Sequence, residues 1–72
     1  MRNTTDQPIK INIEGFGECT ATRSVVLGEY YQWTIRHPFV QATGDYSFDN
    51  GTALRNAIEA LRRAKIRQTK RQ

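Results

Sequence analysis

The sequence predicts an α+β domain in which an antiparallel β-meander of three or four strands is covered on one face by a single C-terminal α-helix. Three observations lead to this prediction. Residues 52–68 are the only long stretch whose apolar residues recur at helical spacing. Shorter stretches before it alternate apolar with polar residues or are rich in β-branched and aromatic residues, which is typical of strands. Glycine and proline separate these stretches, so the connections should be short turns.

The N-terminal part should consist of a loose arm and one strand. Residues 1–7 are polar and have no periodicity, so they are expected to form a flexible arm that ends at Pro8. Ile9, Ile11 and Ile13 then alternate with polar residues, the period of two of a strand with one buried face.

The middle of the chain predicts two further strands joined by a tight turn. Residues 20–27 are rich in β-branched residues, but their register stays open because three apolar residues are consecutive at the end. Gly28 and Glu29 are expected to form a type II′ hairpin turn, which takes glycine at its first central position. Residues 30–37 alternate aromatic or aliphatic with polar residues and should form a central strand that ends at Pro38.

The last strand and the start of the helix complete the predicted core. Residues 42–48 are expected to form a strand with both of its aromatic residues on one face. Asp49 or Asn50 should cap the helix, with Thr52 as a competing choice. The predicted core is Ile9, Ile11, Ile13, Val25 or Val26, Trp33, Ile35, Tyr46, Phe48, Leu54, Ile58 and Leu61.

The predicted helix has two contrasting sides. Leu54, Ile58 and Leu61 fall on one stripe, and four alanines beside it form a shoulder that would let the helix lie close on a sheet. That shoulder is Ala53, Ala57, Ala60 and Ala64, and the opposite side carries Arg55, Arg62, Arg63 and Arg67. Ile66 lies off the stripe, so either the helix frays before it or it contacts something outside the chain.

Length and composition narrow the class of protein. The 72 residues suffice for one domain, expected at residues 8–67, followed by a basic tail at residues 68–72. Such a chain buries only about 60% of its unfolded surface, so a homodimer or a partner would be a natural supplement. A single cysteine, Cys19, excludes an intramolecular disulfide, and the sequence shows neither a signal peptide nor a membrane span. A cytoplasmic location is expected.

The charge is unevenly distributed along the chain. Residues 1–50 hold four basic and six acidic residues, whereas residues 51–72 hold seven basic residues and one acidic residue. Such asymmetry is a hint of a basic segment that meets nucleic acid or another acidic surface. The alternative is that the charge only solvates an exposed helix face.

The residues do not form a recognisable catalytic, metal or cofactor site. His37 is the only histidine, and no serine or cysteine is obviously paired with it. A metal site fails on the number of ligands, and no glycine-rich phosphate loop exists because Gly15 and Gly17 lack a third glycine before a helix. We therefore expect a protein that is not an enzyme and has no cofactor.

One row of polar residues on the central strand has the chemistry of base or phosphate recognition. Alternation places Gln32, Thr34 and Arg36 on one face, which is also what an ordinary solvated sheet face would contain. Phosphate contacts would come from the C-terminal cations, which are Arg55, Arg62, Arg63, Arg67, Lys70 and Arg71.

A family resemblance rests on three segments. These are YYQWTIRHP, a strand ending in YSF, and NGTALRNAIEALRRA, which together span roughly residues 22–66. They resemble the AP2-like DNA-binding arm, three strands plus a helix, at the N-terminus of phage tyrosine integrases. The resemblance implies a sheet that lies in the major groove and gives Gln32, Thr34 and Arg36 the role of reading bases. An isoleucine strand precedes the unit here, the sheet face is poorer in Arg and Lys, and no catalytic domain follows.

Three functional hypotheses follow. The first is a small nucleic-acid-binding accessory or regulatory protein of phage or mobile-element type, with duplex DNA as the favoured partner. The second is a protein-binding inhibitor of a host or defence complex, of the phage anti-defence type. The third is a self-associating subunit that pairs through the sheet edges at Ile9–Ile13 or at residues 42–48.

Overall fold

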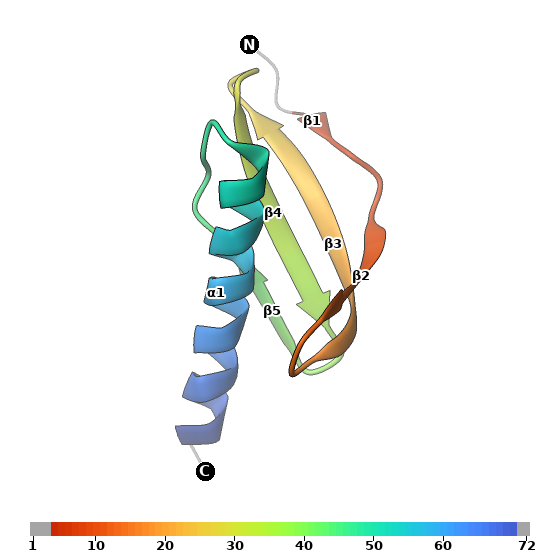
Figure 1. Ribbon diagram of the computed structural model, residues 1–72, viewed down its shortest axis with the longest axis vertical. Helices are drawn as coiled ribbons and strands as arrows, with labels where there is room; N and C mark the ends of the chain where they lie inside the picture. Colours follow the sequence, from red (N-terminus) through yellow and green to blue (C-terminus); the bar gives the residue numbers. More distant parts are fainter. Residues whose placement is uncertain (1–3, 71–72) are drawn as a thin grey trace.

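The chain folds into two layers, a twisted antiparallel sheet and one helix that lies along it (Figure 1). The computed structural model describes the backbone of residues 4–70 and the side chains of residues 4–65. Its elements are β1 (Thr4–Thr5), β2 (Ile9–Ile13), β3 (Gly17–Val26), β4 (Tyr30–His37), β5 (Val40–Thr43) and α1 (Asn50–Lys70). The predicted α+β meander with a C-terminal helix is confirmed, and β1 brings the sheet to five strands.

One edge of the sheet is built from two short strands that both pair with β3. Thr5 is opposite Ser24 and Ile9 is opposite Ala21, so three residues on this edge face two on β3. Thr4 and Thr5, which the sequence places in the flexible arm, thus belong to the sheet. Asp6 fixes the step between β1 and β2, because its amide donates to the Arg23 carbonyl and its carboxylate accepts from Arg23 Nε at 2.6 Å.

The β3–β4 hairpin turns one residue earlier than predicted. Leu27 and Gly28 both have positive φ, and the Glu29 amide donates to the Val26 carbonyl at 3.2 Å. These are the dihedral signs of a type I′ turn, so the predicted type II′ turn at Gly28-Glu29 is wrong. The hairpin settles the open register, since Val25 lies opposite Tyr31 on the helix side of the sheet.

The segment between β5 and α1 carries an extra residue that reverses its faces. Thr43 pairs with Thr34, but Ser47 bridges to Tyr31, so three residues lie opposite two. A shift of one residue moves every following side chain to the other face of a sheet. Tyr46 and Phe48 are therefore 56% and 64% exposed, and their predicted place in the core is wrong. They still share a face, as the sequence predicted.

Asp49 is the residue that caps the helix. Its carboxylate accepts hydrogen bonds from the backbone amide of Thr52 at 2.8 Å and from the Thr52 hydroxyl at 3.0 Å. These bonds, the backbone one first, hold the pKa of Asp49 below its ordinary value. Next to the cap, the Trp33 indole N–H donates to Asn50 Oδ1 at 3.0 Å, which ties the start of α1 to β4.

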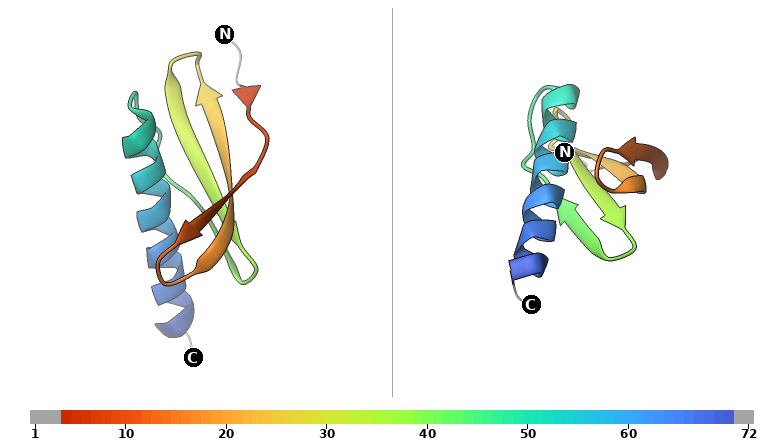
Figure 2. Two further views of the ribbon diagram at one scale, coloured as in Figure 1. Left: turned by 45° about the vertical axis from the view of Figure 1, so that its right-hand side comes forward. Right: turned by 60° about the horizontal axis from the view of Figure 1, so that its bottom comes forward.

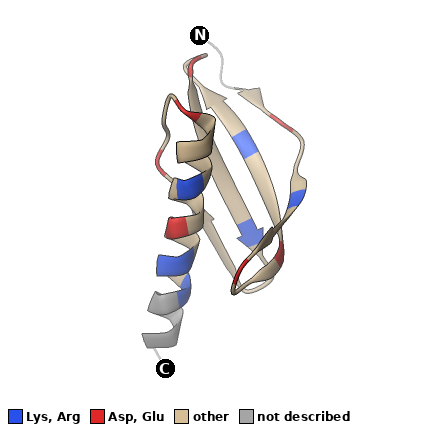
Figure 3. Cartoon of the chain, in the orientation of Figure 1, with Lys and Arg blue, Asp and Glu red and all other residues tan. Residues whose placement is uncertain are grey.

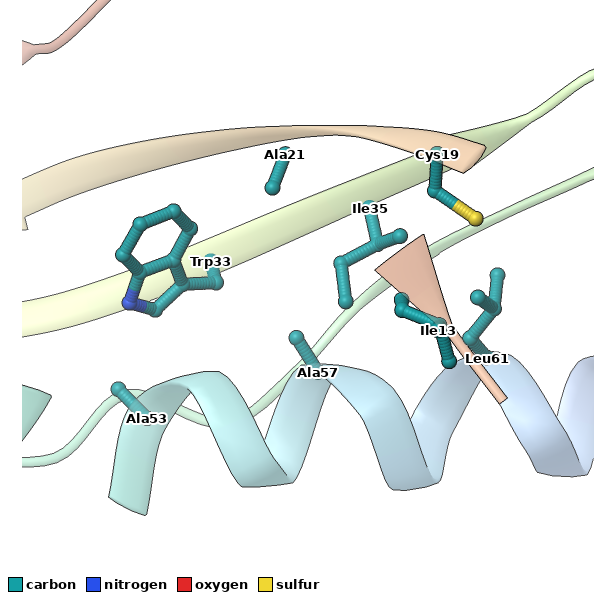
Figure 4. Close-up of a cluster of buried hydrophobic side chains, with 8 residues drawn as sticks. All are labelled: Ile13, Cys19, Ala21, Trp33, Ile35, Ala53, Ala57 and Leu61. Atoms are coloured by element: carbon teal, nitrogen blue, oxygen red, sulfur yellow. The ribbon is translucent and has the colours of Figure 1, made fainter. Parts of the chain in front are cut away.

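The alanine shoulder, and not the leucine–isoleucine stripe, forms the centre of the helix–sheet contact. Ala53, Ala57 and Leu61 are fully buried, whereas Leu54 and Ile58 are half-buried at the flank. Figure 4 shows the two alanines pointing from α1 toward β4. The buried core is Ile13, Cys19, Ala21, Trp33, Ile35, Ala53, Ala57 and Leu61.

The core is narrower than predicted at the β2 edge. Ile9 is 49% exposed because α1 packs on β4 and β5, two strands away from this edge. Ile13, at the other end of β2, is buried near Leu61 (Figure 4). The residues of β3 that are buried in the core are the small residues Cys19 and Ala21.

Candidate nucleic-acid interface

The predicted base-reading residues lie together on the side of the sheet that faces away from α1, called here the open face. Trp33 and Ile35 are buried under the helix, so alternation along β4 places Gln32, Thr34 and Arg36 on the opposite side. The views in Figure 2 show that no other element covers this side of β4. The sequence-based grouping of these three residues agrees with this arrangement.

Each of the three side chains is hydrogen-bonded to β5 or to the residue that follows it. Gln32 Nε2 donates to the Gly44 carbonyl at 3.1 Å, and the hydroxyls of Thr34 and Thr43 are 2.9 Å apart. Arg36 Nε donates to Gln41 Oε1 at 3.2 Å. A base edge at this face would therefore have to share or replace existing hydrogen bonds, and Arg36 is the one cation among these three residues. Lys10 of β2 shares this face, because it pairs with Thr20, which pairs in turn with Arg36.

The second predicted set lies on the helix. Arg55, Arg62 and Arg63 are exposed on α1, and we call them the basic helix face. Helical spacing places Arg55 and Arg62 on the side away from the sheet, whereas Arg63 lies at the flank of the helix next to β5. Within residues 50–65 the only carboxylate is that of Glu59, which is 4.0 Å from an Arg63 guanidinium nitrogen. Both side chains are largely in water, so this ion pair neutralises little. Figure 3 shows the run of basic residues along α1.

Some of the predicted cations lie outside the residues that the structure describes. The side chains of Arg67 and Lys70, and the whole of Arg71, lie outside the described residues, as does the side chain of Ile66. The helical backbone does continue to Lys70, beyond the predicted end at residue 68.

Lys65 is a basic residue of the same helix that sequence reasoning omitted from the site. Its ammonium group donates to the Gly15 carbonyl at 3.1 Å and lies 4.8 Å from the centre of the Phe16 ring. The lysine thus ties the helix to the β2–β3 turn. Its position in the sequence, four residues after Leu61 on the apolar flank, was the available signal for that inward role.

The two predicted sets lie on opposite outer surfaces of the molecule. The open face is the outside of the sheet layer, and the basic helix face is the outside of the helix layer, with the core between them. One straight stretch of duplex therefore cannot contact Gln32 and Arg62 at the same time. The structure brings together the described members of each set but not the two sets.

Sequence reasoning missed an exposed cluster of aromatic rings at one end of the open face. Tyr30 contacts Phe48 with ring centres 4.3 Å apart and Tyr46 with ring centres 5.4 Å apart. We call these three residues the aromatic patch. The signal that could have found it is Gly44, because a glycine in a strand often marks an extra residue in the ladder.

Other chemistry-bearing groups of the described residues have structural roles. Cys19 of β3 is buried in the core between the sheet and α1, and burial raises the pKa of its thiol. His37 accepts a hydrogen bond at Nδ1 from the Phe39 amide at 3.3 Å, inside the β4–β5 hairpin. In the described part of the chain, no group of three or more His, Cys, Asp or Glu side chains is placed to hold a metal ion. The described helix is also too polar to cross a membrane.

Comparisons with models of protein families, with curated proteins and with solved structures found no match to this chain. The resemblance to integrase arms therefore stays a prediction, and a functional assignment has to rest on the chemistry of the surfaces described above.

Proposed function

We propose that this chain is a small non-enzymatic nucleic-acid-binding protein of accessory or regulatory type, and that its basic helix face docks on the phosphate backbone of duplex DNA. The observation that carries the proposal is the charge of that face. Arg55, Arg62 and Arg63 are exposed on one helix, and Glu59 is the one acidic residue among residues 50–65. The capping carboxylate of Asp49, at the start of the helix, also interacts electrostatically with Arg55. Guanidinium groups pair well with phosphate oxygens, and contacts of this kind position a protein without reading sequence.

The open face is the weaker candidate for the first contact with DNA. Its charged residues on the central strands are Arg36 and Glu18, which carry opposite signs. The polar side chains of Gln32 and Thr34, on the same face of β4, are hydrogen-bonded to Gly44 and to Thr43 of β5. A face of this kind could read bases only after other groups had brought the duplex close. The basic helix face offers net positive charge, and DNA would not have to displace hydrogen bonds such as those of Gln32 and Thr34 to reach it.

The test is a fluorescence anisotropy titration of a labelled duplex DNA at low and at moderate salt. The helix variant is Arg62→Glu/Arg63→Glu. Its matched control is Lys10→Glu/Arg36→Glu, which changes the net charge by the same four units on exposed residues of β2 and β4. The affinity should fall steeply with salt, with a log–log slope of about −0.9 per phosphate contact.

Binding that is lost in the helix variant and largely kept in the control would support the proposal. The reverse pattern would move the contact to the open face, as the resemblance to integrase arms implies. Equal losses in both variants would mean that net charge alone drives binding. A titration curve that does not respond to salt would contradict phosphate docking.

A further inference from the structure

The aromatic patch of Tyr30, Tyr46 and Phe48 is held in place by the local backbone. Ser47 exchanges two backbone hydrogen bonds with Tyr31, at 2.8 and 2.9 Å, and this bridge directs the two neighbouring rings to the open face. The Ser47 hydroxyl also accepts from the Asp49 amide at 3.2 Å. The rings are thus fixed by the same segment that starts the helix, while most of the Tyr46 and Phe48 surface stays in water.

The surroundings of the aromatic patch are acidic, in a chain whose net charge is +4. The two segments that supply the rings, residues 26–31 and 44–50, contain three carboxylates and no lysine or arginine. The three are Glu29, Asp45 and Asp49, each a chain neighbour of one ring. Figure 3 shows acidic residues in the β3–β4 turn and in the segment before α1, and basic residues along the helix and on β2, β3 and β4. The molecule therefore has an acidic aromatic end distinct from its basic helix face.

These observations define the chemistry of an occupant. The face of an aromatic ring attracts a cation, and a carboxylate nearby adds to that attraction. Single-stranded nucleic acid also stacks on exposed aromatic rings, but the exposed carboxylates of Glu29 and Asp45 in the same segments would repel its phosphates. Exposed aromatic residues bordered by charge are typical of protein interfaces, where Tyr, Phe and Arg are enriched.

We propose that the aromatic patch is a docking surface for a cationic segment of a partner protein, which places arginine or lysine side chains on the rings of Tyr46 and Phe48. This surface is independent of the basic helix face. The chain would then connect two partners, nucleic acid through the helix and a basic protein segment through the sheet. The hypothesis that this chain is a protein-binding inhibitor also requires a surface of this kind.

The experiment uses the full chain, labelled with ¹⁵N, and an eight-residue peptide in which arginine alternates with glycine. The peptide should shift the amide resonances of residues 29–31 and 45–49 in a saturable way. Tyr46→Ala/Phe48→Ala should weaken binding about tenfold or more, since it removes both exposed ring faces. Phe39→Ala is the matched control, because Phe39 is an exposed aromatic residue in the β4–β5 turn, away from the patch.

A second variant tests the charge without touching the rings. Glu29→Gln/Asp45→Asn should weaken binding of the peptide and make it less sensitive to salt. Both residues are exposed, so the fold should be kept. Duplex DNA titrations of the same variants separate this proposal from the proposed function, because loss of peptide binding with DNA binding intact assigns the two partners to different surfaces.

Three results would overturn the proposal. One is the absence of any saturable shift at peptide concentrations up to about 1 mM. Another is equal affinity of Tyr46→Ala/Phe48→Ala and the unmodified chain. The third is a set of patch resonances that shift with protein concentration alone, which would make a second copy of this chain the occupant.

Discussion

Gly44 and Ala57 are in direct backbone contact: a Cβ atom on Gly44 would lie 2.6 Å from the Cα atom of Ala57 and closer still to its amide nitrogen. No real Cβ atom approaches a backbone this closely. Gly44 is buried, and its amide donates to the Trp33 carbonyl at 3.1 Å, so it cannot move away without breaking the ladder. The distance between the helix and the sheet is therefore set by a residue that has no side chain.

The first prediction follows from this contact. Gly44→Ala should lower the free energy of unfolding by about 3 kcal/mol or leave the chain unfolded, because the added methyl group pushes the helix off the sheet. Gly51→Ala is the control, since its Cβ would meet only the Asp49 carboxylate at 3.3 Å and alanine favours the helix. Urea unfolding followed by circular dichroism measures both. Equal effects of the two substitutions would contradict the contact.

The second prediction concerns the β3–β4 turn. Leu27 has φ of 56°, a left-handed conformation that asparagine adopts more readily than leucine. Leu27→Asn should raise the free energy of unfolding by about 0.5 to 1 kcal/mol. Glu29→Asn should not raise it, because Glu29 does not have a positive φ. A lower melting temperature for Leu27→Asn than for the unmodified chain would argue against the type I′ turn.

The third prediction concerns the hydrogen bond between Trp33 and Asn50. Asn50→Ala leaves the buried indole N–H without its acceptor and should cost about 1 to 3 kcal/mol. In a Trp33→Phe background the same substitution should cost much less, since that donor is gone. The double-mutant cycle is measured by denaturant unfolding. Additive losses would show that the bond does not contribute to stability.

The fourth prediction concerns pH. The pKa of Asp49 is lower in the folded chain than in the unfolded chain, so its contribution to stability is present above the unfolded value near pH 4 and is lost as the pH falls through the folded value. Asp49→Asn keeps a capping side chain but cannot titrate. Its melting temperature should therefore depend less on pH in the acidic range than that of the unmodified chain. Asp45→Asn serves as the exposed control, and an identical acid response in both variants would contradict the cap assignment.

The fold was predictable because most local signals agree with it. The period of two places Trp33 and Ile35 in the core, and Asp49 was among the expected caps. The reversed face of Tyr46 was not predictable from alternation, because one extra residue in the ladder shifts every later side chain. The central place of Ala57 depends on the close approach at Gly44, which no pattern within either segment reveals.

The candidate site was predictable only in parts. Alternation grouped Gln32, Thr34 and Arg36 correctly, and helical spacing grouped Arg55 with Arg62. The strand residues and the helix residues face opposite ways because α1 packs on the other face of β4 and β5. This packing belongs to the tertiary structure and cannot be deduced from either segment alone. The aromatic patch depends on the same tertiary information and on the extra residue before Ser47.

The two outer edges of the sheet are both interrupted, and this affects how the protein behaves in concentrated solution. On one side, β1 and β2 are separated by a step that contains Pro8, which has no N–H to offer. On the other side, β5 ends after four residues, where the ladder takes in its extra residue. Neither edge offers a long, flat template to another chain, so we expect this protein to resist growth into amyloid-like fibrils.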